Sequence, residues 1–207
     1  KGAETALNRF SPIIVESLTT LFKNRENPSA EHVTMFKTGL GSLQESKLLK
    51  GIIIKRRILM DNLPNNLMNP KVAILDSDLK IRKLTRSVEI KINTANQLDS
   101  FVDAEQDRKT SITDAIIKSG VTAIFCSGEI DRDILHQLSD NDILTVGELD
   151  SAEIENIANA VGATLIDSIL DIKSSDLGEC KTIQWERREN TDQVEDIIII
   201  DGCKNPK

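Results

Sequence analysis

Apolar residues recur with helical spacing near the start of the chain, from Ala3 to Phe22. This spacing predicts a strongly amphipathic helix that needs a partner for its apolar face. Pro12 lies inside the pattern, and we expect it to kink or subdivide the helix near Phe10, because proline removes a backbone hydrogen bond. A short strand is expected at 33–37, followed by a flexible joint around Gly39-Leu-Gly41.

The longest uninterrupted helical pattern runs from Thr94 to Ser119, with no Gly or Pro inside it. Its apolar residues fall on one face, but the same face carries Glu105 and Lys109 at mid-length. The pattern alone favours a surface helix whose central turn faces water. At a rise of 1.5 Å per residue this helix would be roughly 39 Å long, so we expect one end to project from the body.

Short apolar segments alternate with helical segments in the second half of the chain. Strands are expected at 71–75, 121–125, 143–146 and 163–166, and helices at 131–138 and 151–161. This rhythm predicts a parallel sheet covered by helices. Further strands are expected within 51–59, at 87–92 and in a hairpin of 180–187 with 194–200, whereas 61–70 is dense in turn-forming residues and is expected to be a loop.

Composition narrows the classes of partner. Hydrophobic residues make up 39% of the chain and aromatic residues 3%, so the core must rest on Ile, Leu and Val. The formal net charge is −7 and the pI about 5.0, which argues against nucleic acid as a partner. No apolar stretch is long enough to span a membrane.

The cysteines and the chain ends bear on location and completeness. Cys126, Cys180 and Cys203 are an odd and scattered set, which suits a reducing, cytoplasmic compartment. The opening Lys1-Gly2, without Met, and the ending Asn205-Pro-Lys207 suggest a piece of a longer protein.

A search for catalytic, cofactor-binding and metal-binding residues identifies none. Gly39-Leu-Gly41 lacks the third glycine of a phosphate-binding loop. His32 and His136 have no second ligand at zinc spacing. Asp76-Ser-Asp78 follows a strand, and a solvated turn is favoured over a metal or acid-base site because no third ligand is evident. Cys126 is interpreted as a buried core cysteine.

Two segments near the C-terminus introduce a family resemblance. Asp176-Leu-Gly-Glu179 and Gly202-Cys-Lys-Asn-Pro206 resemble the closing stretch of the apical domain in group II chaperonins, the thermosome and CCT family. Leu48 to Ile54, Pro70 to Asp76 and Ser119 to Cys126 are similar to earlier segments of that domain, in the same order. The resemblance covers nearly the whole chain, with Gly-Cys-Lys-Asn-Pro as its most specific piece.

The resemblance implies an α/β apical domain, a sheet flanked by helices with a helical protrusion, plus a helical piece of the intermediate domain. Residues 1–50 would be partial intermediate domain, 51–203 the substrate-binding apical domain with a protrusion at about 88–112, and 204–207 the return to the intermediate domain. The chain would be a binding and lid module rather than an enzyme. ATP and Mg would belong to the full-length protein, because the equatorial nucleotide motif is absent here.

The implied partners are unfolded or partly folded client proteins and neighbouring subunits of a double ring. In the family, clients bind between an apical helix and a nearby loop, which by position match 151–161 and roughly 57–69. The residues expected to face clients are Glu153, Glu155, Asn156 and Asn159 on the helix, and Leu63, Leu67 and Met68 on the loop. The loop residues could equally fold back onto the domain. Leu98 and Phe101 are expected at the tip of the lid.

The sequence also departs from the family pattern. It has Ser127-Gly-Glu-Ile-Asp-Arg-Asp133 where relatives carry a Gln-Lys-Gly-Ile-Asp-Asp type segment, which indicates a divergent paralogue. The alternative interpretation is a chaperonin-like scaffold domain inside another protein, such as a phosphoinositide kinase. The sequences flanking this chain would separate the two.

Overall fold

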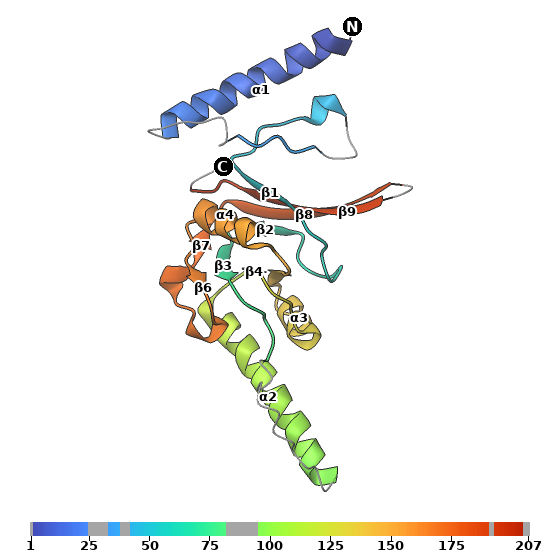
Figure 1. The fold of residues 1–207 in the computed structure, drawn as a ribbon, viewed down its shortest axis with the longest axis vertical. Helices are drawn as coiled ribbons and strands as arrows, with labels where there is room; N and C mark the ends of the chain where they lie inside the picture. The colour runs from blue at the N-terminus through green and yellow to red at the C-terminus, as the bar shows by residue number, and fades with distance from the viewer. Residues whose placement is uncertain (1, 25–32, 38–41, 82–94, 191–192, 205–207) are drawn as a thin grey trace.

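The computed structural model of the protein describes residues 2–24, 33–37, 42–81, 95–190 and 193–204. The fold is mixed α/β, as predicted, with two sheets stacked below a long N-terminal helix and a second long helix projecting from the opposite end (Figure 1). The predicted strand at 87–92 lies outside the described residues.

The first sheet is antiparallel and has the strand order β1-β9-β8-β2. Its strands are β1 (Gly51–Lys55), β2 (Asn66–Met68), β8 (Thr182–Asn190) and β9 (Gln193–Asp201). The hairpin of β8 and β9, paired from Thr182↔Asp201 to Asn190↔Gln193, confirms the predicted antiparallel hairpin. The segment 61–70, predicted to be only a loop, contains β2, which pairs with β8.

The second sheet contains the predicted parallel strands. Strands β5 (Leu144–Val146), β4 (Ala123–Cys126), β3 (Lys71–Leu75) and β6 (Leu165–Ile166) run parallel, and β7 (Gly178–Glu179) pairs antiparallel with β3. Strand β3 is buried on both faces, because Val72 and Ile74 pack into one apolar cluster and Ala73 and Leu75 into another. This explains its unbroken apolar sequence.

Helices cover the two faces of the parallel sheet. Helix α4 (Ser151–Val161) packs with the first sheet in one cluster, which holds Ile154, Phe125 and Ile198. Helices α2 (Ala95–Ser119) and α3 (Arg132–Ser139) cover the other face. Short 3-10 turns at Leu43–Glu45 (η2), Ile169–Asp171 (η3) and Ser174–Asp176 (η4) complete the described elements.

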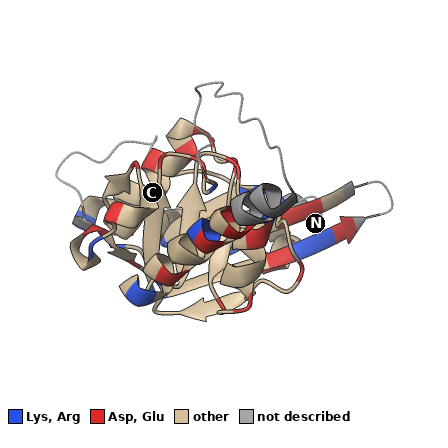
Figure 2. Ribbon diagram, turned by 90° about the horizontal axis from the view of Figure 1, so that it is seen from below, with Lys and Arg blue, Asp and Glu red and all other residues tan. Residues whose placement is uncertain are grey.

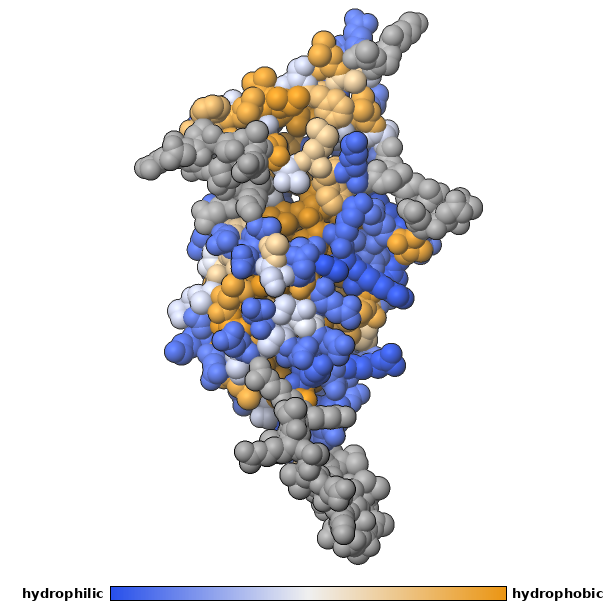
Figure 3. All heavy atoms as spheres, viewed as in Figure 1, coloured by the Kyte–Doolittle hydropathy of each residue, from blue (hydrophilic) through white to orange (hydrophobic). Residues whose placement is uncertain are grey.

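Helix α1 (Gly2–Asn24) is continuous through Pro12, so the predicted subdivision near Phe10 is wrong. The segment 33–37 has no regular structure, so the strand predicted there is wrong as well. Apolar side chains of α1 remain exposed, and Figure 3 shows them as an orange band along the helix: Leu7, Ile14, Val15, Leu18 and Phe22.

Candidate functional site

A fixed loop follows β1 and presents two apolar side chains. Ile58 and Leu63 anchor it, being 2% and 3% exposed, and the Ile58 N–H donates to the Asp196 carboxylate at 2.8 Å. Between these anchors Leu59 is 44% exposed and Met60 is half-buried. The loop therefore holds Leu59 and Met60 at the surface of a well-packed region.

Helix α3 lies across from this loop. Asp131 caps the helix, because its carboxylate accepts from the N–H groups of Asp133 at 2.9 Å and Ile134 at 3.4 Å. Ile134 and Leu138 pack onto the parallel sheet, whereas Leu135 belongs to the cluster on the loop side. The helix thus has one face for each apolar cluster.

A groove of about 460 Å³ lies between the loop and α3. Its apolar residues are Leu59, Met60, Ile130 and Leu135, and its polar residues are Glu129, Arg132, His136 and Glu148. Half of the lining residues are thus polar or charged, which makes the groove a mixed apolar and polar surface. The sequence analysis placed a binding loop at roughly 57–69 but paired it with 151–161, because only tertiary packing brings α3 beside the loop.

Lys80 forms ion pairs beside the groove, at the groove residue Glu129. Lys80 Nζ lies 3.0 Å from a Glu129 oxygen and 3.1 Å from an Asp78 oxygen, and these bonds raise the pKa of Lys80. Asp78 also accepts from the Glu129 N–H at 2.9 Å. The residues Asp76-Ser-Asp78 therefore belong to a structural turn.

The polar residues predicted on α4 do not line this groove. Glu153 is engaged within the fold, because its carboxylate accepts from Arg56 and from the Asp150 N–H at 3.1 Å as part of a capping box. Glu155 and Asn159 are exposed, and Asn156 is half-buried. The expected outward face is thus present, except that Glu153 stabilises the start of the helix.

The predicted loop residues divide by burial. Leu63 is in the core, Leu67 is half-buried against the same cluster, and Met68 is 67% exposed. For Leu63 the structure favours the alternative in which the side chain folds back onto the domain. Leu98 and Phe101 lie in α2, but their side chains are outside the described residues.

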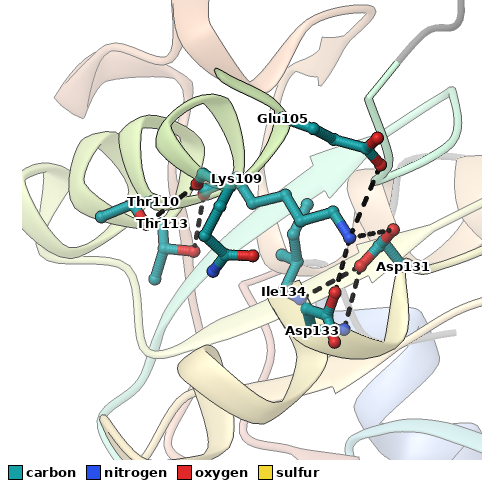
Figure 4. A network of polar contacts seen from close by, with 8 residues as sticks. Glu105, Lys109, Thr110, Thr113, Asp131, Asp133 and Ile134 are labelled. Carbon is teal, nitrogen blue, oxygen red and sulfur yellow. Dashed lines mark hydrogen bonds and ion pairs between the residues drawn. The ribbon is translucent and has the colours of Figure 1, made fainter. Parts of the chain in front are cut away.

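Lys109 of α2 sits at the junction of two helices (Figure 4). Its side chain is 10% exposed, and Nζ lies 2.6 Å from Asp133, 3.2 Å from Asp131 and 3.9 Å from Glu105. The expectation that the central turn of this helix faces water is therefore wrong for Lys109. The hydrogen bond to Asp133 raises the pKa of Lys109, and the same bond lowers the pKa of Asp133.

The N-terminal part of α2, which precedes Lys109, projects from the domain. Residues 103–108 are all exposed, whereas Ile116 is fully buried and Ile112 half-buried against the sheet. Ile117, the residue after Ile116, is 40% exposed. In Figure 1 the helix runs away from both sheets, as its length predicted.

A second cavity, of about 770 Å³, lies between the loop and the β8–β9 hairpin. Arg187 binds the Asp196 carboxylate through two nitrogens at 2.7 and 3.0 Å and also contacts Asp61. Asp196 has a side chain that is 2% exposed, and it is fully hydrogen-bonded by Arg187 and the Ile58 N–H. This arrangement is structural, because it anchors the loop to the hairpin.

The cysteine assignments follow from burial. Cys126, Cys180 and Cys203 are all buried and unpaired in disulfides. Burial raises the pKa of Cys126 to about 12, so its thiol stays protonated at neutral pH, and the prediction of a core cysteine is confirmed.

Within the described residues, no helix is both long and apolar enough to cross a membrane.

Comparison with known proteins places the chain among the chaperonins. The model of the TCP-1/cpn60 chaperonin family matches residues 1–207. The chain therefore belongs to the TCP-1/cpn60 chaperonin family.

Thermosome subunits are similar over the full chain. Thermosome subunit alpha of Archaeoglobus fulgidus is 30% identical over 210 residues, which cover 100% of this chain and 38% of that protein. A thermosome subunit of Methanopyrus kandleri is 26% identical with the same coverage. The open-state monomer of a group II chaperonin from Methanococcoides burtonii has a similar fold, with a TM-score of 0.57 and 19% identity over 80% of this chain and 34% of that one. The chain thus spans well under half the length of these relatives.

Proposed function

We propose that this chain is the client-binding and lid portion of a group II chaperonin subunit. Residues 51–203 form the apical domain, 1–50 part of the intermediate domain, and 204–207 the return to it. In this proposal the chain binds unfolded or partly folded proteins and is not itself an enzyme, and ATP and Mg act only in the full-length ring. Family membership and the whole-chain similarity to thermosome subunits support the assignment.

The groove between the loop and α3 is the observation that carries the proposal. It exposes Leu59 beside the half-buried Met60 and Ile130, on a surface that is fixed by buried anchors and backed by the buried Leu135. A non-native protein exposes apolar side chains, and their burial in such a groove stabilises the complex by about 25 cal/mol per Å² of apolar area. Preformed walls reduce the entropy lost on binding.

A binding assay on two groove residues tests this assignment. Replacing Leu59 and Met60 together by Ser should weaken the capture of a chemically denatured protein by about tenfold, since two apolar contacts are lost. Leu170→Ser is the matched control, because Leu170 is 60% exposed on η3 outside the groove. Met68→Ser tests the predicted loop residue that lies outside the groove. It should leave the capture unchanged if the groove alone binds the denatured protein. Unchanged capture by the Leu59 and Met60 variant would exclude the groove.

The projecting part of α2 supports the proposal that the chain contributes to a lid. Residues 103–108 are exposed, and the helix is held near Lys109 and Ile116, so its N-terminal half has the form of a finger. In the proposal, Leu98 and Phe101 meet neighbouring fingers when the ring closes. Deleting 88–112 from the full-length protein should abolish ATP-driven protection of an enclosed client from protease. Full protection in that deletion would refute the lid.

A further inference from the structure

We propose that the groove selects client segments in which a Lys or Arg stands next to an apolar residue, with the Glu148 carboxylate as the group that recognises the cation. The inference rests on the client-binding function proposed above and names the chemistry of its ligand.

Glu148 is held in a left-handed conformation, with φ at +60°. Glycine and asparagine are the ordinary residues in this region, because a larger side chain crowds the backbone there. The Glu148 N–H donates to the Gly128 carbonyl at 3.0 Å, and the neighbouring Leu149 N–H donates to the Cys126 carbonyl at 3.2 Å. The side chain of Leu149 is buried, whereas Glu148 is exposed at the groove. A rigid backbone therefore presents this carboxylate.

The second carboxylate at the groove already has a cation bound to it. Glu129 is bound by Lys80 at 3.0 Å. Arg132 is the cation of the groove, and among the described residues it forms no ion pair with Glu148 or with any other carboxylate. Within the described part of the chain, Glu148 makes no ion pair, so it is the carboxylate left to receive a cation from outside. Figure 2 shows that acidic positions are spread widely over this end of the molecule, in keeping with the net charge of −7.

The apolar residues of the groove specify the second half of the ligand. Leu59 and Met60 stand on the loop, and Ile130 and Leu135 on the side of α3, around a volume of about 460 Å³. This space accommodates an apolar side chain of a polypeptide. A cationic side chain beside it can then reach Glu148, and attraction between partly exposed charges adds modest affinity and more selectivity.

Matched peptides test the proposal by fluorescence anisotropy on the full chain. One peptide carries a Leu-rich segment flanked by Lys, and the other the same segment flanked by Gln. The chain should prefer the Lys peptide by about two- to fivefold at low salt, and less as salt is raised. Glu148→Asn and Glu148→Gln should remove this preference, so that each variant binds the Lys peptide and the Gln peptide with equal affinity. Asn also suits the left-handed backbone, so Glu148→Asn should keep or raise the melting temperature.

Glu155→Gln is the control for general electrostatics, because it makes the same change in net charge on the exposed face of α4. It should keep the preference for the Lys peptide. A preference that survives Glu148→Asn, or that falls equally in Glu155→Gln, overturns the assignment to Glu148. Binding of both peptides with equal affinity overturns this inference alone, whereas binding of neither overturns the proposed function with it.

Discussion

At the scale of single residues, the polar groups buried in this fold are held by specific partners. Asp196 lies on β9 with its side chain 2% exposed, between the two Arg187 nitrogens and the Ile58 N–H. A buried carboxylate without such partners would be strongly destabilising. Asp196 thus attaches the loop after β1 to the β8–β9 hairpin. This loop carries the groove residues Leu59 and Met60.

Asp196→Asn should therefore destabilise the protein by about 3 kcal/mol at pH 7, since it leaves Arg187 without its main partner. Arg187 holds the pKa of Asp196 below its ordinary value. The resulting stabilisation is complete above the unfolded pKa near 4 and is lost as the pH falls through the lower folded pKa. Urea unfolding between pH 2 and 7 should show a shallower acid dependence in the variant than in the wild type.

Glu189→Gln is the control for the Asp196 experiment, because Glu189 is an exposed acidic residue on β8, close to the same cavity. It should leave both the stability at pH 7 and the acid dependence nearly unchanged. An acid profile of Asp196→Asn that is parallel to the wild type would show that this carboxylate does not titrate in the unfolding transition.

At the scale of elements, Lys109 joins the finger helix α2 to α3. The ammonium group lies within 4 Å of carboxylates from both helices, including Asp131, which also caps α3. Removing the cation leaves the carboxylates of Glu105, Asp131 and Asp133 close together and unneutralised. The junction between the two helices then becomes repulsive.

Lys109→Met should lower the free energy of unfolding by about 2 kcal/mol, because the apolar stem is kept while the buried charge is lost. Hydrogen exchange should rise at the start of α3 and in α2 near Lys109, but not in β3 and β4. Lys118→Met, an exposed substitution on the same helix, is the control and should change neither quantity. Equal effects of the two substitutions would contradict a linking role for Lys109.

The elements that could be predicted from sequence are those whose pattern reports burial directly. The strand at 71–75, the alternating units from 121 to 166 and the hairpin were recoverable, because buried strands and capped helices leave clear local signals. Strand β2 was not, since it pairs with β8 more than a hundred residues away and has no apolar alternation of its own. Pro12 is tolerated inside α1, which local propensity cannot anticipate.

The candidate site was less predictable than the fold. Its walls come from the loop after β1 and from α3, and only tertiary packing shows that Leu59 faces Leu135 across a groove. The resemblance places client binding between this loop and α4, whereas the groove lies between the loop and α3, and Glu153 of α4 is bound by Arg56. The polar gap in α2 was visible in sequence, but its cause, an ion-pair cluster with α3, required the structure.

At the scale of the whole molecule, the chain corresponds to 38% of the length of the thermosome subunits it resembles, and we expect it to bind no ATP. The sequence contains no Gly-Lys-Ser/Thr phosphate loop, and its net charge of −7 disfavours a polyanion. Isothermal titration with ATP and Mg should show no saturable heat, while the same titration on a protein extended to the relatives' full length should. Tight, saturable binding to this chain alone would contradict our proposal that client capture and nucleotide binding lie in separate domains.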